Sequence, residues 1–234
     1  MAIWIVLIII PMLFGLYAQM RVQSAYNKNV QIPSRGRITG REAADAVMRS
    51  AGITNVEIVQ VPGQLTDHYD PIHRRLALSE LNYNGTSLAA LGVAAHEAGH
   101  AIQHKVGYQM MNIRQTLAPS TQIAASVSNY VILAGILMLS YLRNPFGYNL
   151  LYIGAIALAV IVLFQLVTLP VEFDASRRAK AQLVTLGILD KDEMKGANET
   201  LDAAALTYVA AFVAALGSLL HIVMIIAGGN RRDD

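Results

Sequence analysis

Four long stretches of the chain contain only uncharged, mostly apolar residues. Residues 1–20 hold no Asp, Glu, Lys or Arg, and the same is true of residues 115–142, 144–171 and 203–230. An α-helix needs about 20 apolar residues to cross the roughly 30 Å of hydrocarbon in a bilayer. The pattern therefore predicts four transmembrane helices, at about residues 2–19, 123–142, 150–170 and 205–227.

The first apolar stretch has a cleaved signal peptide as its alternative interpretation. No basic residue precedes its apolar core, however, and no clear small-residue cleavage site follows it, although signal peptides carry both features. We therefore expect residues 1–20 to form a permanent N-terminal transmembrane anchor.

Composition excludes several classes of protein. Of the 234 residues, 54% are hydrophobic and only 15% are charged, whereas soluble domains average about 25% charged residues and disordered chains are poor in hydrophobic ones. A net charge of +2 does not supply the clustered positive charge of a nucleic-acid groove, so we expect no nucleic-acid partner. The chain lacks cysteine, so any metal ion must be held by His, Asp or Glu.

The distribution of Lys and Arg predicts an orientation in the membrane. Ten of these residues lie between the first and second expected helices and five between the third and fourth, against three elsewhere, namely Arg143, Arg231 and Arg232. Since the more basic side of a membrane protein faces the cytoplasm, residues 21–122 and 172–204 are expected inside. Residues 123–171 would then form a transmembrane hairpin, and residues 205–234 the fourth helix with a short outer tail.

Residues 21–122 have the pattern of a small α+β unit. Thr39 and Glu42 match a capping box before a helix that stops near Gly52. Residues 56–61 and 74–81 are typical of strands, and Ser87 can cap a helix that reaches Lys105, with Gly107 beyond its end. The expected fold is thus mainly α, with four transmembrane helices and a small α+β metallopeptidase unit of zincin type.

The motif that points to chemistry is His96-Glu97-Ala98-Gly99-His100. Residues four apart lie on one face of a helix, so both imidazoles can bind one ion, and Glu97 can act as the general base for a water activated by zinc. This is the HExxH pattern of zinc peptidases. The alternative is a surface His-Glu-His cluster without a ligand, but the apolar flanks predict a buried helix, in which these polar groups need partners.

Three further residues are candidates near this helix. His104 continues the four-residue spacing but lies about 5.4 Å further along the axis, so we expect a second-shell or rim residue. Glu172 ends a charge-free run at a depth where an isolated charge is costly. It is either a third ligand or an interfacial carboxylate paired with an arginine at 177 or 178. Asp174 lies about 200° around the helix from Glu172, so only one of the two should face the ion.

Four segments together resemble the YugP-type membrane zinc metallopeptidases of bacteria: residues 65–71, 87–104, 166–179 and 201–210. The resemblance covers nearly the whole chain. Glu172-Phe173-Asp174-Ala175 is also similar to the third-ligand segment of HtpX-type membrane proteases, which are gluzincins, and this similarity implies zinc as the cofactor and a ligand role for Glu172. The sequence has Ser176 where those proteases have an Asp, so the partner that this Asp would provide is in doubt.

Some polar residues outside the motif remain open to two interpretations. Residues 67–70 form a polar turn or a cleft edge, where His68 or Tyr69 would donate to an oxyanion. If the strand after Arg74 borders the cleft, it can bind an extended peptide by strand addition. Tyr208 is an interfacial tyrosine or a hydrogen-bond donor to a tetrahedral intermediate, and for His221, inside the fourth span, we expect a structural role.

The sequence therefore predicts a zinc endopeptidase in the bacterial cytoplasmic membrane with its active site at the cytoplasmic face. His96, His100 and Glu172 are expected to hold the zinc ion. Its expected partners are a protein or peptide substrate and the lipid bilayer. The alternatives are a site-2-like protease that cuts within the bilayer and a metal-binding membrane scaffold without hydrolytic activity. The sequence leaves the substrate, the cleavage preference and the oligomeric state open.

Overall fold

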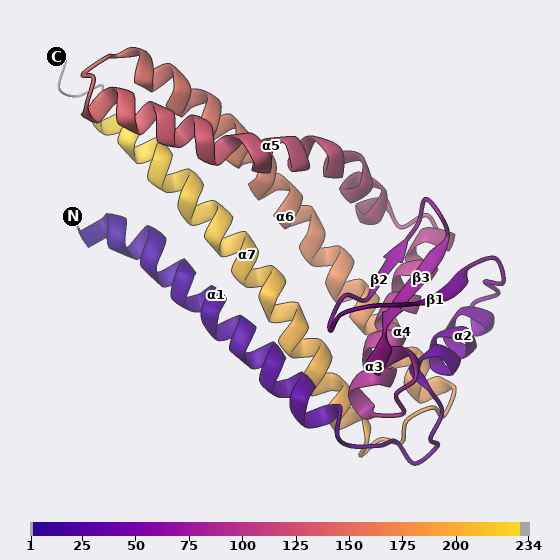
Figure 1. The fold of residues 1–234 in the computed structure, drawn as a ribbon. Coiled ribbons are helices and arrows are strands. Elements are labelled where there is room, and N and C mark those ends of the chain that lie inside the picture. The colour runs from indigo at the N-terminus through magenta and orange to yellow at the C-terminus, as the bar shows by residue number, and fades with distance from the viewer. Residues whose placement is uncertain (1, 230–234) are drawn as a thin grey trace. The chain divides into compact units, whose positions relative to one another are not determined.

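The computed structural model describes residues 2–229, which are mainly helical (Figure 1). The predicted outer tail, with Arg231 and Arg232, lies outside the described residues. The elements in chain order are α1 (Ala2–Asn29), α2 (Gly40–Ser50), β1 (Glu57–Val61), β2 (His68–Asp70), β3 (Arg75–Ser79), α3 (Glu80–Tyr83), α4 (Leu88–Lys105), α5 (Gln109–Ser140), α6 (Phe146–Thr185) and α7 (Met194–Gly229).

Within residues 2–229, four helices are long and apolar enough to cross a membrane, namely α1, α5, α6 and α7. The helices α1, α6 and α7 each contain one of the predicted spans, and α5 covers the predicted span 123–142 up to Ser140. The helix α6 continues to Thr185, so Glu172 lies on an α-helix. The chain separates into two compact units, the first with residues 1–17, 113–169 and 208–234, and the second with residues 18–112 and 170–207.

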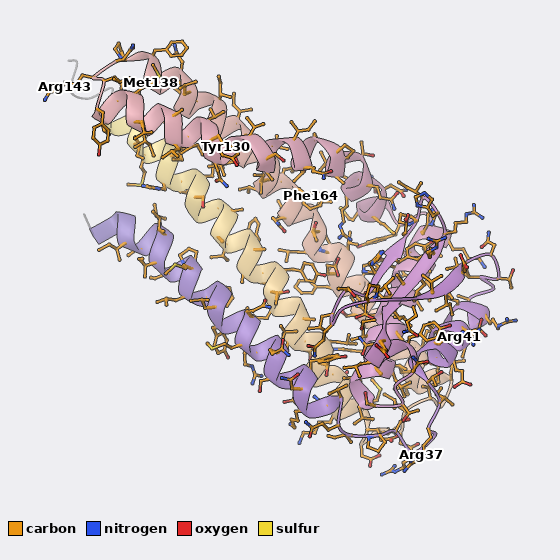
Figure 2. All side chains as sticks on the ribbon, in the orientation of Figure 1. Arg37, Arg41, Tyr130, Met138, Arg143 and Phe164 are labelled. Atoms are coloured by element: carbon orange, nitrogen blue, oxygen red, sulfur yellow. The ribbon has the colours of Figure 1, made fainter. Side chains whose placement is uncertain are left out.

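The first unit consists of helical segments with apolar surfaces. Side chains such as Ile123, Tyr130 and Ile156 are more than two thirds exposed, and Figure 2 shows side chains of this kind along α5 and α6. Exposed apolar surface on this scale is typical of a face that meets lipid. The helices α5 and α6 approach closely at Gly135 and Gly147, where a β-carbon on either glycine would lie within 3 Å of the other's carbonyl oxygen.

The second unit contains the sheet, whose strand order is β1-β3-β2. The strand β3 is parallel to β1 and antiparallel to β2. The strand after Arg74 is therefore central, and both of its edges are paired, so it is not free to bind a peptide by strand addition. The strand β2, which belongs to the segment predicted to be a polar turn or a cleft edge, is an edge strand. The predicted strand 74–81 ends at Ser79, because Glu80 begins the short helix α3.

The helix α4 forms the centre of the second unit. Ser87 Oγ accepts a hydrogen bond from Ala90 N, and Gly107, with φ +64°, follows the end of the helix, as predicted. The capping box of α2 is also confirmed, since Thr39 and Glu42 bond each other's backbone amides. Fourteen of the 18 residues of α4 are buried, among α2, the sheet and the parts of α6 and α7 that belong to this unit. A helix buried all round must satisfy its polar side chains internally.

Candidate metal centre

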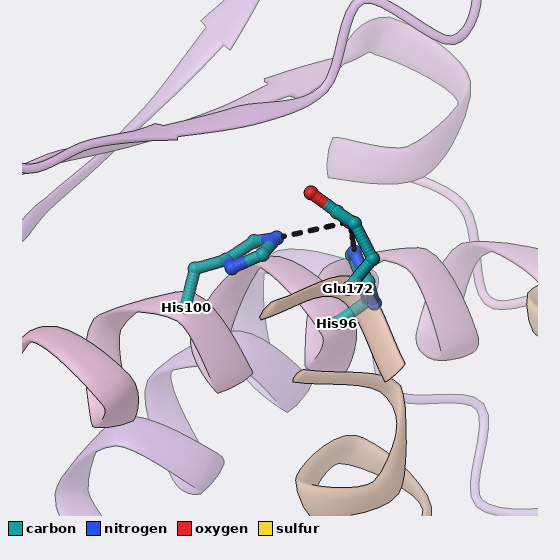
Figure 3. A group of neighbouring side chains, drawn as sticks. All are labelled: His96, His100 and Glu172. Carbon is teal, nitrogen blue, oxygen red and sulfur yellow. Dashed lines mark hydrogen bonds and ion pairs between the residues drawn. The ribbon is translucent and has the colours of Figure 1, made fainter. Parts of the chain in front are cut away.

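Two histidines and a glutamate meet on α4 and α6 within the second unit (Figure 3). His96 Nε2 lies 3.2 Å from Glu172 Oε2, and His100 Nε2 lies 3.5 Å from the same oxygen. One potential ligand atom from each of the three residues lies within 4.8 Å of the other two. The Glu172 side chain is only 2% exposed. These are the donor types and the convergence that a metal ion needs, and they lie where water has little access.

The local sequence explains why α6 comes so close to α4. His96 and His100 are four residues apart, so their rings project from one face of α4. Gly99 lies between them, and a β-carbon there would be 2.6 Å from the carbonyl oxygen of Ala175 on α6. Glycine at position 99 thus allows the α6 backbone to contact α4 directly, which brings Glu172 to the two rings.

The outer nitrogen of each imidazole has its own partner. His96 Nδ1 lies 3.1 Å from Ser176 Oγ, and His100 Nδ1 lies 3.0 Å from Gln103 Oε1. Because an amide oxygen only accepts hydrogen bonds, His100 Nδ1 must donate, so in the neutral ring Nε2, the nitrogen nearer Glu172, carries the lone pair that can bind a metal ion. Ser176, which stands where HtpX-type proteases have an Asp, thus contacts one of the two histidines of the cluster.

Gln103 is fully buried, and three contacts fix the orientation of its amide. Its Nε2 donates to the Val171 carbonyl at 2.8 Å and to Asp174 Oδ2 at 3.0 Å, so Oε1 must face His100. One side chain therefore connects the second histidine with the backbone next to Glu172. The sequence analysis missed Gln103, although its position three residues after His100 places it on the same side of the helix.

Asp174 is not a member of the ligand group found in the described residues. Its carboxylate accepts hydrogen bonds from Gln103, Arg177 and Arg178. The two arginines considered as partners for Glu172 therefore pair with Asp174. Glu172 and Asp174 point to different partners, as their angular separation on a helix predicts.

Burial raises the pKa of the Glu97 carboxyl, and the nearby imidazoles of His96 and His100 only partly oppose this effect. For His100, burial lowers the pKa, but the hydrogen bond to Glu172 and the charges of Glu172 and Glu97 outweigh it, so the pKa is raised. Glu97 is 7% exposed. A carboxyl with a raised pKa close to two histidines has the properties of a proton-transfer group.

The other candidate residues are not members of the ligand group found in the described residues. His104 Nδ1 pairs with the hydroxyl of Tyr69 at 2.8 Å, and neither residue belongs to the ligand group found among residues 2–229. His68 Nδ1 bonds the Thr66 carbonyl oxygen at an exposed position. Tyr208 and His221 lie on α7 in the first unit.

A second polar network, which the sequence analysis did not identify, supports the segment before β2. Asp67 accepts hydrogen bonds from the Ser79 amide at 2.7 Å and from Asn82 Nδ2 at 2.8 Å. Asn82 Oδ1 in turn accepts from the hydroxyl of the fully buried Tyr26 at 2.9 Å. The loop before β2 is thereby fixed to β3, α3 and α1.

Two comparisons relate the chain to known proteins. Residues 4–227 match the model of a protein family described as "Putative neutral zinc metallopeptidase". The chain is 40% identical over 228 residues to the "Putative membrane protease YugP" of Bacillus subtilis (strain 168), an alignment that covers 97% of this chain and 98% of the relative. A search of solved structures gave no match.

Proposed function

Because the chain belongs to the family described as "Putative neutral zinc metallopeptidase", we propose that it is a membrane-bound zinc endopeptidase that hydrolyses peptide bonds. The observation that carries the proposal is the cluster of His96, His100 and Glu172, whose ligand atoms lie within 4.8 Å of one another. The name of the Bacillus relative and the four apolar helices together describe a multi-pass membrane protein.

The three side chains fit a zinc ion. Two imidazole nitrogens and one carboxylate oxygen are a set found in catalytic zinc sites, which leave a fourth position open. Since both Nδ1 atoms have partners, both Nε2 atoms are directed toward Glu172. Without an ion, a buried carboxylate must be balanced by imidazolium charge. When bound there, zinc supplies a Lewis acid that polarises the peptide carbonyl and acidifies water.

Glu97 is the proposed general base. It follows the first histidine ligand, and burial raises its pKa above the usual value of a glutamate, which makes it a stronger base. It would take a proton from the attacking water and pass it to the amide nitrogen, which leaves as an amine. His96, His100 and Glu172 hold the ion in this scheme, while Gln103 and Ser176 orient the two imidazoles. Partners of this kind support metal ligands in other metalloproteins.

The edge strand β2 is the proposed guide for the substrate. Only one side of β2 is paired within the sheet, where His68, Tyr69 and Asp70 face β3 residues. An extended peptide can add to a free strand edge through backbone hydrogen bonds. Tyr69 joins this strand to α4 through His104, so the edge and the motif helix belong to one hydrogen-bonded assembly.

We place the reaction on the cytoplasmic side of a bacterial membrane and outside its apolar layer. The excess of Lys and Arg in residues 21–122 and 172–204 supports this side. The helix α4, which carries the histidines, is not one of the four membrane-length helices found in the described residues. This supports cleavage outside the bilayer over the site-2-like alternative.

Metal dependence tests the proposal directly. The full chain, purified in detergent, should contain about one zinc ion and cleave an unfolded protein such as casein. A chelator should abolish cleavage, and added zinc should restore it. Cleavage that persists after complete removal of zinc would contradict the proposal.

A further inference from the structure

A cavity of about 430 Å³ lies beside the last turn of α4, within the second unit. Its walls are the loop of residues 52–56, Tyr69 from β2, Arg74 from the turn before β3, and Ala101, His104 and Lys105 from α4. A volume of this size accommodates a side chain or a small ligand. None of these residues belongs to the metal-ligand group.

The walls carry positive charge and no carboxylate. The cationic residues of the lining are Arg74 and Lys105, and the lining contains neither Asp nor Glu. Lys105 Nζ donates to the backbone carbonyls of Ala51 and Gly52, which hold the ammonium group in place without neutralising it. Throughout the part of the chain that the structure describes, Arg74 forms no ion pair, whereas the next residue, Arg75, pairs with Glu57 at 3.4 Å. A cavity of this kind favours an anionic ligand.

Arg74 is held in an unusual backbone conformation. Its φ is +50°, a left-handed value that residues other than glycine rarely adopt. Three hydrogen bonds hold the backbone at this turn: Asp70 Oδ1 accepts from the amides of Ile72 and His73, and the Arg74 carbonyl accepts from Glu57 N. Such strain persists where the surroundings fix it and is concentrated at functional sites.

The cavity is close to where the proposed substrate would lie. His104 is one helical turn beyond the ligand His100 and bonds Tyr69 on the edge strand β2. A peptide extended along β2, with its scissile bond at the metal centre, would carry neighbouring side chains past this cavity. On the basis of the function proposed above, we infer that the cavity is a subsite for a carboxylate of the peptide substrate, either an Asp or Glu side chain or the C-terminal carboxylate.

Matched peptides test the inference. Zinc-loaded wild-type protein is assayed with internally quenched peptides in which each position in turn carries Glu or Gln, and with peptides that end in a free carboxylate or an amide. The ratio of kcat/KM for acid over amide should be about tenfold or more at one position or at the C-terminus, the scale expected for hydrogen bonds to a charged group. The two peptide series distinguish the side chain from the terminal carboxylate. Arg74→Gln should bring this ratio close to one, whereas the matched control Arg75→Gln should keep it.

A binding measurement separates this inference from the proposed reaction. In the Glu97→Gln variant, fluorescence anisotropy should show tighter binding of the acidic peptide than of its amide, and Arg74→Gln added to that variant should remove the difference. This result would support the subsite even if the protein hydrolysed no peptide. Equal binding and cleavage of acidic and amide peptides at every position would overturn it. The inference would also be overturned if the protein bound phosphatidylglycerol vesicles in an Arg74-dependent way but showed no preference between acidic and amide peptides.

Discussion

The side-chain oxygen of Gln103 lies 3.0 Å from His100 Nδ1, while its nitrogen donates to the carbonyl of Val171, the residue before Glu172. Gln103 thereby sets which nitrogen of His100 is free to bind a metal and fixes the backbone that carries the carboxylate. Removing such a partner typically weakens metal binding by about 10- to 100-fold. The site thus depends on a residue that is neither a ligand nor a base.

Gln103→Ala should therefore lower zinc affinity by about 10- to 100-fold, because His100 loses the acceptor that orients its ring. Competition with a zinc chelator of known affinity measures the change. Gln182→Ala is the matched control, since the side-chain hydrogen bond of Gln182 in the described residues is with Ser50 and not with a member of the cluster. Wild-type zinc affinity in folded Gln103→Ala protein would show that this hydrogen bond does not position the ligand.

Gly99→Ala should destabilise the second unit and impair the site. The added methyl group would lie 2.6 Å from the Ala175 carbonyl oxygen, and forcing backbones apart in a packed interior costs about 1–3 kcal/mol. Thermal unfolding in detergent would show a lower Tm, together with weaker zinc binding. The control is Gly15→Ala on α1, where nothing lies within 4 Å of the new β-carbon. Equal Tm values for the two variants would contradict close packing of α4 against α6.

Glu97→Gln should stabilise the zinc-free protein, and increasingly so as the pH rises. Burial raises the folded-state pKa of Glu97. At a pH below its unfolded-state pKa, the carboxyl is protonated in both the folded and the unfolded protein, so its ionisation does not change the free energy of unfolding. Above that pH the unfolded state ionises first, and the wild type loses stability until the folded pKa is reached. Chelator-treated Glu97→Gln should thus gain more in Tm over the wild type at pH 7.5 than at pH 5, with exposed Glu80→Gln as the control. An equal gain at both pH values would contradict the raised pKa.

The orientation can be tested with single cysteines because the chain contains none. Arg41 lies on α2 in the segment proposed to be cytoplasmic, and Arg143 lies between α5 and α6 (Figure 2). The two test variants are Arg41→Cys and Arg143→Cys. In intact bacteria, a membrane-impermeant maleimide should label the cysteine at position 143 and leave that at position 41 unmodified until the cells are lysed. The opposite labelling pattern would reverse the proposed topology.

Local features of the chain could be predicted from the sequence, and long-range ones could not. His96 and His100 share a helix face because of their spacing, and the Thr39–Glu42 capping box is confirmed because both residues act within one turn. Glu172 lies 76 residues from His96, and from the residues alone its role as ligand or ion-pair partner stayed open. The strand β2 has only three residues, which is too short to give a recognisable alternating pattern. The sheet order, with β3 in the centre, depends on which strands pair in the folded chain. Gln103 is visible on the motif helix, but its partners Val171 and Asp174 are revealed only by the fold.

The most direct test of the central claim compares wild-type and Glu97→Gln protein, both purified in detergent and loaded with zinc. Metal analysis and cleavage of casein are measured on the same samples, with Glu80→Gln as a matched control. We predict that Glu97→Gln retains about one zinc ion per chain, because His96, His100 and Glu172 are intact, while its cleavage rate falls by at least about 100-fold, the lower end of general-base contributions. Wild-type cleavage by zinc-loaded Glu97→Gln would contradict the account.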